Sequence, residues 1–438
     1  MKDKLKSFFS EKKVLILGFG REGMSTLELI KDFDCTIAIS DKSFNTETKI
    51  ESYKLYGGHN YLSCLDDDFD IIVKTPGIAL FDTVTEEVKQ KITSQTDLLL
   101  RFCENTIIGI TGTKGKSTTS SLVHHILESC GKKALLIGNI GIPPLAKIDE
   151  FEEDTILVCE MSCHQLEYVK ASPDIAVLLN IYEEHLDHYS SFAAYKYAKE
   201  NIFRHLEKND TLICNANCLS DEVKALPCEV FSAALDETAD IFADKEKISI
   251  CGIDAPLESI STKLVGHHNY YNIAVALACA VFAGCEIDSA IRAVGTFCGL
   301  EHRLELVKTI NGIRYINDSI STIPLAAVSA VKAFENADTI IIGGMDRGIS
   351  YELLIDFLND SSVKNVICLK DSGYKVYERL DRTKLNAVKA IDLPDAVRIA
   401  SEVTKHCCVF SPAAASYGFY KNFEERGKHF KELVNLLQ

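Results

Sequence analysis

The chain has 438 residues, of which 47% are hydrophobic and 25% are charged, and its formal net charge at pH 7 is −16. This length and composition predict a globular protein of about two to four domains. The acidic balance argues against a nucleic-acid partner, and any anionic ligand must be held in a locally basic site. Because no apolar run is long enough for a signal peptide or a membrane span, we expect a cytoplasmic protein without a membrane span.

The 16 cysteines are scattered along the chain and form no C-x-x-C pair. A disulfide framework is typical of small secreted domains, and zinc sites have closer ligand spacing. We therefore interpret the cysteines as reduced core residues.

The first section of the chain alternates strand and helix patterns, as a parallel α/β sheet does. Its first strand candidate, VLILG, leads into the glycine pattern of a dinucleotide-binding turn, and an acidic residue closes the next strand candidate. These residues are Gly18, Gly20, Gly23 and Asp41. The pattern favours a nucleotide or UDP-type ligand over a tight strand-to-helix turn that binds nothing.

The segment IIGITGTKGKSTT predicts a buried strand, a phosphate-binding loop and a helix, in that order. Gly112 and Gly115 let backbone N–H groups turn toward phosphate oxygens, Lys116 adds a positive charge, and the Ser117 hydroxyl can reach Mg²⁺. The broader pattern G-x-x-x-x-G-K-[ST] would need glycine where Ile110 stands, so this is the shorter G-T-x-G-K-S-T form. The segment predicts a nucleoside triphosphate ligand rather than an ordinary glycine-rich turn.

Polar residues cluster after two further strand candidates, where ligands gather in open α/β sheets. Glu160 ends one of them, and the segment NIYEEHLDHY after the other supplies Glu183, Glu184, His185, Asp187 and His188. Oxygen ligands with one imidazole suit Mg²⁺ better than zinc. We interpret His188 as an ordinary loop histidine.

Three further polar residues are ambiguous from the sequence alone. Lys199 lies in a helix candidate, AAYKYAKENIF, where a lysine is usually solvated. Asn269 and Asn272 are suited to bind a base edge and equally suited to cap a helix.

A third set of strand candidates, including TIIIGGMD and CCVFSP, begins near residue 300. The fold class predicted is α/β with three domains: a Rossmann-like domain at 1–100, a central mostly parallel domain like a P-loop ATPase at 101–299, and a Rossmann-like domain at 300–438. No internal repeat or low-complexity linker separates them.

Ordered motifs along nearly the whole chain resemble the Mur ligase family, and most closely its glutamate-adding branch. They are GFGREG, TPGIAL, GTKGKST, GNIG, EMSCHQLE, NIYEEHLDHY, GHHN, GLEHRLE, NDSIST, GGMDRG, SPAAAS and KNFEERG. The resemblance implies a UDP-substrate site at Gly18, Gly20, Asp41, Thr75, Pro76, Gly77 and Asn139. It implies an ATP site at Gly112, Thr113, Lys114, Gly115, Lys116, Ser117, Thr118, Asn269, Asn272, Arg303 and Asp318.

The resemblance also implies two Mg²⁺ sites, held by Ser117, Glu160, His185 and a carbamylated Lys199. Lys116, Glu160, His185 and Lys199 are then the catalytic residues. Carbamylation requires an uncharged amine, so we expect Lys199 to be partly buried.

The implied reaction has two steps and no covalent enzyme intermediate. The carboxylate of UDP-N-acetylmuramoyl-L-alanine attacks the γ-phosphate of ATP, and the amine of glutamate then displaces phosphate from the acyl phosphate. Closure of the third domain is expected to assemble the reacting groups. The product belongs to peptidoglycan precursor synthesis, and so to cell-wall biogenesis, cell shape and cell division. A monomer is expected.

Two positions depart from the family pattern for the amino-acid substrate. Ile320 and Arg347 stand where lysine is common, whereas Thr322, Ser416 and Phe423 match the glutamate site. Arg347 can bind a carboxylate with two hydrogen bonds. Glutamate is therefore expected, with the D-enantiomer favoured and an L-glutamate-adding branch left open.

Two other classes of protein fit part of the sequence. A non-catalytic regulator could bind a UDP-sugar or ATP, but it is expected to lack some catalytic positions. A Rossmann oxidoreductase would explain GFGREG, but it leaves GTKGKST and the cluster of Glu160 and His185 unexplained.

Overall fold

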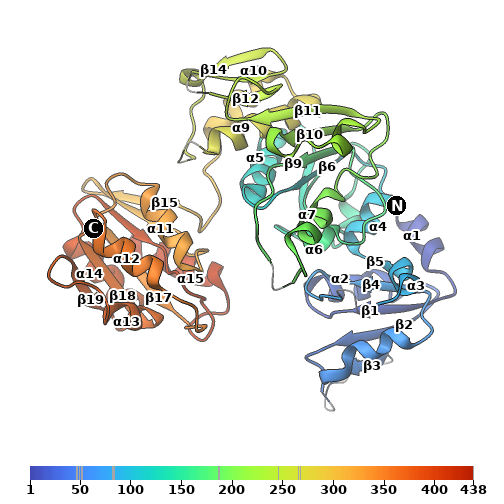
Figure 1. Ribbon diagram of the computed structural model, residues 1–438, viewed down its shortest axis with the longest axis horizontal. Helices are drawn as coiled ribbons and strands as arrows, with labels where there is room; N and C mark the ends of the chain where they lie inside the picture. The colour runs from blue at the N-terminus through green and yellow to red at the C-terminus, as the bar shows by residue number, and fades with distance from the viewer. Residues whose placement is uncertain are drawn as a thin grey trace. The chain divides into compact units, whose positions relative to one another are not determined.

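The computed structural model describes residues 1–45, 48, 50, 53–80, 84–185, 188–244, 246–264, 266 and 268–437. The chain falls into two compact units, of which the first comprises 1–262 and 267–297 and the second 263–266 and 298–438. The first unit contains a five-stranded and a nine-stranded sheet, and the second contains a six-stranded sheet (Figure 1). The predicted α/β class is confirmed, and the three domain boundaries stay a prediction.

The N-terminal sheet is parallel throughout, with the Rossmann-like order β3-β2-β1-β4-β5. Alternate residues of β1 enter different cores, because side chains of a strand point to opposite faces. Val14 and Ile16 pack with helices α1, α2 and α4, and Leu15 and Leu17 pack on the other face. The elements are α1 (Lys2–Phe9), β1 (Lys12–Leu17), α2 (Arg21–Ile30), β2 (Cys35–Asp41), β3 (Lys54–Gly57), η1 (Gly58–Asp66), β4 (Ile71–Lys74), α3 (Glu86–Lys91), β5 (Ile92–Thr93) and α4 (Gln95–Phe102).

The central sheet has the order β14-β13-β12-β11-β10-β9-β6-β8-β7, and only its β12-β13-β14 edge is antiparallel. Its elements up to α7 are β6 (Ile107–Thr111), α5 (Lys116–Ser129), β7 (Ala134–Gly138), η3 (Ile148–Glu150), β8 (Ile156–Glu160), α6 (Cys163–Leu166), β9 (Ile175–Leu178) and α7 (Phe192–Glu200). They continue with β10 (Thr211–Asn215), η4 (Ala216–Cys218), α8 (Asp221–Lys224), β11 (Glu229–Ala234), β12 (Ile241–Ala243), β13 (Lys247–Ile250), β14 (Ile253–Pro256), η5 (Leu257–Ser259), α9 (His268–Phe282) and α10 (Ile287–Thr296).

Strand β6 lies in the sheet between β8 and β9, so these two strands flank it on opposite edges. The register pairs Ile110 with Glu160 and Thr111 with Leu178, so the carboxyl ends of all three strands meet. Such a point, where the strand order reverses, opens a crevice in α/β sheets. The fold therefore brings GTKGKST, EMSCHQLE and NIYEEHLDHY to one edge.

The sheet of the second unit has the order β15-β16-β20-β17-β18-β19, and only the β15-β16 pair is antiparallel. Helices α11, α12 and α13 pack on one face with Ile340 and Ile342 of β17, and α14 and α15 pack on the other with Ile341. The elements are β15 (Glu305–Ile310), β16 (Ile313–Asn317), α11 (Pro324–Lys332), β17 (Thr339–Gly344), α12 (Glu352–Asp360), β18 (Asn365–Asp371), α13 (Ser372–Tyr377), β19 (Asn386–Lys389), α14 (Leu393–Val403), β20 (Cys407–Phe410) and α15 (Phe423–Leu436).

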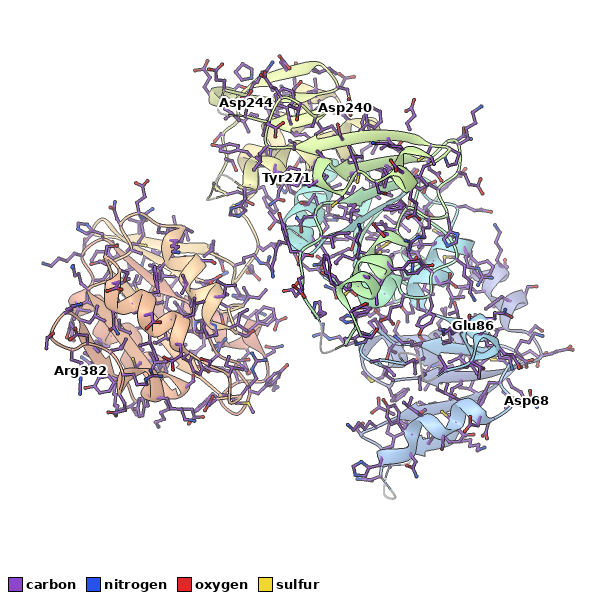
Figure 2. All side chains as sticks on the ribbon, viewed as in Figure 1. Asp68, Glu86, Asp240, Asp244, Tyr271 and Arg382 are labelled. Carbon is purple, nitrogen blue, oxygen red and sulfur yellow. The ribbon has the colours of Figure 1, made fainter. Side chains whose placement is uncertain are left out.

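None of the 16 cysteines, all of which lie in the described ranges, forms a disulfide bond, and several lie wholly inside the cores, among them Cys159, Cys279 and Cys408. Charged side chains such as Asp68 and Glu86 lie at the surface of the first unit, whereas Tyr271 is buried on α9 (Figure 2). Across the described ranges, no helix combines the length and the apolar character that crossing a bilayer requires.

Candidate active site

The loop between β6 and α5 has the backbone of a phosphate cradle. Gly112 and Gly115 have φ angles of 158° and 88°, which L side chains rarely adopt. A Cβ atom on Gly115 would lie only 2.7 Å from Oδ1 of Asn272, so space as well as conformation requires glycine there. Because Gly115 immediately precedes α5, the positive end of that helix faces the loop.

Two lysines converge on one carbonyl oxygen of this loop. Nζ of Lys116 donates to the carbonyl oxygen of Gly112 at 2.9 Å, and Nζ of Lys199 donates to the same oxygen at 2.8 Å. Lys199 is only 1% exposed, and burial, reinforced by the charge of Lys116, lowers its pKa to about 7. Burial also lowers the pKa of Lys116. The prediction that Lys199 is at least partly buried is confirmed.

Glu160 ends β8 and is fully buried beside the loop. Its Oε1 accepts a hydrogen bond from Nδ2 of Asn139 at 2.6 Å, and its Oε2 lies 3.5 Å from the hydroxyl of Ser120 on α5. Asn139 thus holds the carboxylate of Glu160, whereas its predicted contact with a UDP-linked substrate stays a prediction.

Tyr195 on α7 connects the loop with His185 and Lys199. Its hydroxyl lies 2.8 Å from Oγ1 of Thr113, and its ring lies 5.1 Å from Nζ of Lys199. The ring of His185 is 6.0 Å away, between centroids. Burial raises the pKa of Tyr195 to about 12, so its hydroxyl is protonated. Tyr195 lies 82 residues after Thr113 in the chain, and no sequence motif indicates this contact.

Asn180 holds the loop from the end of β9. Its carbonyl oxygen accepts the N–H of Thr113 at 3.0 Å, and its side chain exchanges two hydrogen bonds with the backbone of Lys114, at 2.8 and 3.0 Å. Lys114 is exposed and pairs with Glu184 at 2.7 Å. No role is predicted for Asn180, although its position after the apolar run DIAVLL is a signal of the same kind as that of Glu160.

The two asparagines of α9 lie against the phosphate loop. Nδ2 of Asn272 donates to Oδ1 of Asn269 at 2.9 Å, and Oγ1 of Thr119 lies 3.4 Å from Oδ1 of Asn272, across 153 residues of sequence. Ser117 is half-buried and Thr118 is buried in the first turn of α5. The fold therefore brings Asn269, Asn272, Ser117 and Thr118 together, while their contacts with a nucleotide stay predictions.

The glycine-rich turn after β1 is packed against the TPG segment. Gly18 has a φ of 96°, and a Cβ atom on it would lie 1.9 Å from Oγ1 of Thr75. The N–H of Phe19 donates to Asp41 at 2.7 Å. Burial opposes ionisation of Asp41, but hydrogen bonds from Ser43 and Phe19 outweigh it and hold its pKa below the usual value. Gly18, Asp41 and Thr75 are thus brought together, and Gly20, Pro76 and Gly77 lie in the same two loops.

A buried ion-pair network joins the TPG segment to the histidines of NIYEEHLDHY. Lys74, which is 3% exposed, pairs with Oε2 of Glu167 at 2.9 Å, and Oε1 of Glu167 lies 2.7 Å from Nε2 of His188. The ring of His164 lies 4.1 Å from that of His188 and 5.1 Å from that of His185.

This network corrects one interpretation made from the sequence. His188 is not an ordinary loop histidine, because its side chain is only 13% exposed and it contacts the buried carboxylate of Glu167. Burial, followed by the neighbouring histidines, lowers the pKa of His164 to about 3. Asp187, which belongs to the predicted cluster, lies outside the described residues.

In the second unit, the carboxylate of Asp318 follows β16 and is buried. It accepts hydrogen bonds from Ser321, from Ser411 at 2.8 Å and from the N–H of Leu304 at 3.2 Å. Burial raises its pKa to about 6, although these bonds and the charge of Arg303 oppose the rise. Asp318 therefore organises the loops that follow β16 and β20, and its predicted contact with ATP stays a prediction.

The residues predicted to bind the amino acid lie in the loops after β16, β17 and β20 of the second unit and, for Phe423, at the first position of α15. Nη2 of Arg347 donates to the carbonyl oxygen of Thr322 at 2.9 Å. The hydroxyl of Ser319 donates to the carbonyl oxygen of Phe423 at 2.9 Å. Ser416 is buried in the loop after β20. The structure thus joins Arg347 to Thr322, and Phe423 to the loop that contains Thr322.

Within the described ranges, no group of three or more His, Cys, Asp and Glu side chains could hold a metal ion by itself. The donors predicted for Mg²⁺ are mainly oxygens, namely the hydroxyl of Ser117, the carboxylate of Glu160 and a carbamate on Lys199, with the imidazole of His185. This chemistry fits Mg²⁺, which keeps several waters and uses substrate phosphates as ligands.

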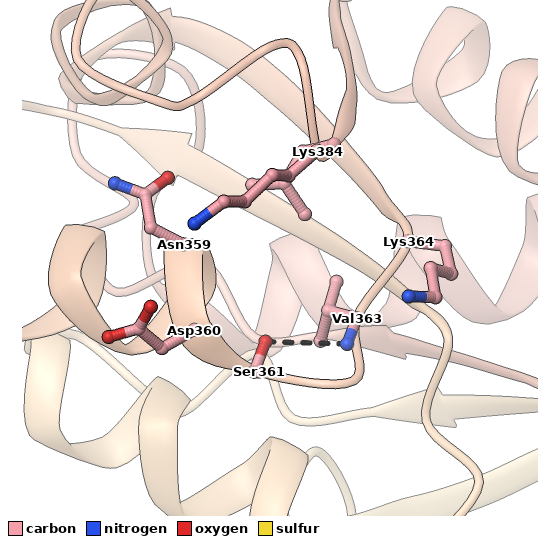
Figure 3. Close-up of a pocket in the computed structure, with 7 residues that line it drawn as sticks. Asn359, Asp360, Ser361, Val363, Lys364 and Lys384 are labelled. Atoms are coloured by element: carbon pink, nitrogen blue, oxygen red, sulfur yellow. Dashed lines mark hydrogen bonds between the residues drawn. The ribbon is translucent and has the colours of Figure 1, made fainter.

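An open pocket of about 430 Å³ lies elsewhere in the second unit (Figure 3). It is lined by the end of α12 and the α12–β18 connection, with Asn359, Asp360, Ser361 and Lys364, and by Lys384 just before β19. No predicted site residue lines it.

Comparison with known proteins places this geometry in a family. The model of the Mur ligase middle domain matches residues 110–280. The UDP-N-acetylmuramoylalanine–D-glutamate ligase of Clostridium kluyveri is 32% identical over 456 aligned positions, covering 99% of this chain and 98% of that protein. The ligase of the same name from Streptococcus uberis is 33% identical, with 98% of each chain covered. The chain belongs to the Mur ligase family.

The fold of this Mur ligase also resembles solved structures of the family. MurF ligase from Thermotoga maritima in complex with ADP has a TM-score of 0.59 at 16% identity, covering 98% of this chain and 96% of that chain. The UDP-N-acetylmuramate-alanine ligase MurC of the same organism has a TM-score of 0.56 at 19% identity, covering 97% and 99%. At these identities the likeness concerns the fold alone, and it agrees with the predicted three-domain Mur ligase architecture.

Proposed function

We propose that this Mur ligase joins D-glutamate to UDP-N-acetylmuramoyl-L-alanine, using ATP and an acyl phosphate intermediate, in peptidoglycan precursor synthesis. The observation that carries the proposal is that the half-buried amine of Lys116 and the buried amine of Lys199 share the carbonyl oxygen of Gly112 in the phosphate loop. Amines that converge on a phosphate cradle suit a reaction between two anions, because a cation there offsets phosphate charge. The names of the full-length relatives support the same reaction.

The first step forms a bond between the substrate carboxylate and the γ-phosphorus of ATP, and the bond from that phosphorus to ADP breaks. Lys116, the loop N–H groups and the N-terminus of α5 hold the phosphate oxygens and offset their charge. In the second step the glutamate amine attacks the carbonyl carbon, phosphate leaves with its electron pair, and the amine loses a proton. The product is an amide, and none of these steps uses a covalent enzyme intermediate.

Lys199 is proposed to be carbamylated. An uncharged amine attacks CO₂ at carbon and loses a proton, which leaves an anionic carbamate in place of a cation. The low pKa of Lys199, about 7, favours this reaction because much of the amine is uncharged near neutral pH. A carbamate beside Lys116 would also remove the repulsion between two cations.

Mg²⁺ is proposed to bind at Ser117, Glu160, His185 and the carbamate of Lys199, where it would neutralise charge on the phosphates. The buried bond from Asn139 keeps the Glu160 carboxylate in one orientation. We expect the enzyme to act as a cytoplasmic monomer on soluble substrates, with consequences for cell-wall biogenesis, cell shape and cell division.

The test measures phosphate release by purified protein with ATP, Mg²⁺, UDP-N-acetylmuramoyl-L-alanine and either D- or L-glutamate. Release that depends on D-glutamate is the expected result. Release of phosphate with L-glutamate only would assign the protein to an L-glutamate-adding branch of the family. Ile320 and Arg347, which stand where lysine is common, leave that assignment open. Binding of ATP and UDP-linked substrate without release in either mixture would instead identify a non-catalytic regulator.

A further inference from the structure

Arg426 on α15 is a buried cation that the mechanism above does not use. It is only 2% exposed, and burial lowers its pKa to about 10. Among the described residues, the ionisable group that raises this pKa is Tyr420 rather than a carboxylate. Arg426 therefore remains charged at neutral pH without an acidic partner in the described part of the chain.

The hydrogen bonds of Arg426 all end on neutral oxygens. Its Nε donates to the hydroxyl of Ser319 at 3.0 Å, and Nη2 donates to the carbonyl oxygen of Ser319 at 2.7 Å. Nη1 donates to the carbonyl oxygen of Ala414 at 3.0 Å. These bonds orient the guanidinium but do not offset its charge, and a buried charge without a counter-charge is costly. An anion that binds nearby would reduce this cost.

The position of Arg426 connects this charge with the amino-acid site. Ser319 lies in the loop after β16, three residues before Thr322, and Ala414 lies in the loop after β20, two residues before Ser416. A Cβ atom on Gly344, at the end of β17, would lie 3.1 Å from Nη1 of Arg426. The guanidinium thus lies beneath all three loops that are proposed to bind the amino acid.

We propose that Arg426 selects an anionic side chain in the amino-acid substrate, by supplying fixed positive charge beneath these loops. The inference rests on the proposed function and names the substrate class of the same site. Arg426 is a positioning residue, because its hydrogen bonds go to the loops. The loop after β16 contains no cation of its own, since Ile320 occupies the position where lysine is common in the family. The buried charge of Arg426 is available in its place.

The test compares D-glutamate with D-glutamine, which differ in the charge of the side chain but hardly in shape. The measured quantity is the ratio of kcat/KM for the two amino acids. In Arg426→Met this ratio is expected to fall by about tenfold, mainly through a higher KM for glutamate. Arg426→Lys, which keeps the charge, is expected to retain the ratio within about twofold. Arg398→Met is the matched control, because Arg398 is exposed on α14 of the same unit and pairs with Asp395 and Glu402.

Two further results separate charge from structure. Ser319→Ala removes one acceptor of Arg426 but keeps the charge, so it is expected to lower kcat without changing the ratio. If Arg426→Met does not fold, the variants Arg426→Lys and Ser319→Ala provide the test. Both keep the positive charge, so a fall in the kcat/KM ratio of D-glutamate to D-glutamine in both would overturn the inference. An unchanged ratio in folded Arg426→Met would also overturn it. Absence of turnover with glutamate in the unmodified enzyme would instead refute the proposed function.

Discussion

Lys199 is the residue whose chemistry is most altered by its surroundings. Its amine is buried, contacts the carbonyl oxygen of Gly112 and lies near the amine of Lys116. An ordinary charged lysine would be unfavourable here, and a carbamate would replace its charge with an anion. The residue that a sequence pattern alone would leave on the surface is thus the one with the strongest physical reason to be modified.

Lys199→Ala is expected to lower kcat by about a hundredfold or more, because the proposed carbamate ligand would be lost. Steady-state phosphate release measures this change, and added acetate is expected to restore part of the rate. Lys196→Ala is the matched control, since Lys196 lies on the same helix with a 46% exposed side chain. Turnover of Lys199→Ala equal to that of the control would exclude the carbamate.

The low pKa of Lys199 also predicts how stability depends on pH. In the folded protein this pKa is about 7, against the ordinary lysine value of 10.5. Between these values the unfolded chain binds more protons, so this residue makes the folded state more stable as pH rises through that range. Urea unfolding at about pH 7 and pH 9, in CO₂-free buffer, measures how steeply the free energy of unfolding rises with pH. Lys199→Met is expected to reduce this slope. An identical slope in both proteins would contradict the shifted pKa.

At the scale of elements, the turn from β6 into α5 depends on Gly115. Gly115→Ala introduces a Cβ atom 2.7 Å from Oδ1 of Asn272, in a backbone conformation with φ of 88°. We expect KM for ATP to rise by about tenfold, because the loop must move to relieve this contact. Gly131→Ala is the control: its φ is 78°, but no atom lies within 4 Å of the added Cβ. It is expected to cost about 1 kcal/mol of stability without changing KM.

The segment EMSCHQLE links the two sheets of the first unit through Glu167. Removing one partner from a buried ion pair leaves the other uncompensated, so Glu167→Gln is expected to lower the free energy of unfolding by about 3 kcal/mol. Glu152→Gln, which breaks the exposed pair with Lys133, is expected to cost less than about 1 kcal/mol. Urea unfolding measures both changes.

A double-mutant cycle with Lys74→Met tests the pairing itself. The effects of Glu167→Gln and Lys74→Met are expected to be strongly non-additive, because both remove the same 2.9 Å contact. KM for the UDP-linked substrate is expected to rise in both variants, since Lys74 directly precedes the TPG segment. Additive losses of stability would show that the pair is not coupled.

For the whole molecule, local patterns predicted several of the strands and helices that carry the site. The predicted strand, loop and helix of GTKGKST correspond to β6 and α5, and TILVCEMS contains β8. These predictions are correct because strand and helix periodicities are local properties of the sequence. The α/β class follows from their alternation.

Contacts between distant residues were not predictable in the same way. Lys74 and Glu167 are separated by 93 residues, and Thr113 and Tyr195 by 82. No periodicity of one chain encodes which side chains meet when separate strands pair. For that reason the contacts of Tyr195, Asn180, Glu167 and His188 emerged only from the structure, as did the isolated charge of Arg426.

In the proposed mechanism, ATP activates the substrate carboxylate as an acyl phosphate. UDP-N-acetylmuramoyl-L-alanine labelled with oxygen-18 in its terminal carboxylate, incubated with ATP, Mg²⁺, D-glutamate and the enzyme, tests it most directly. One labelled oxygen is expected in the released inorganic phosphate, because the bond between carbon and that oxygen breaks when the amine attacks. Amide product formed with unlabelled phosphate would contradict the account.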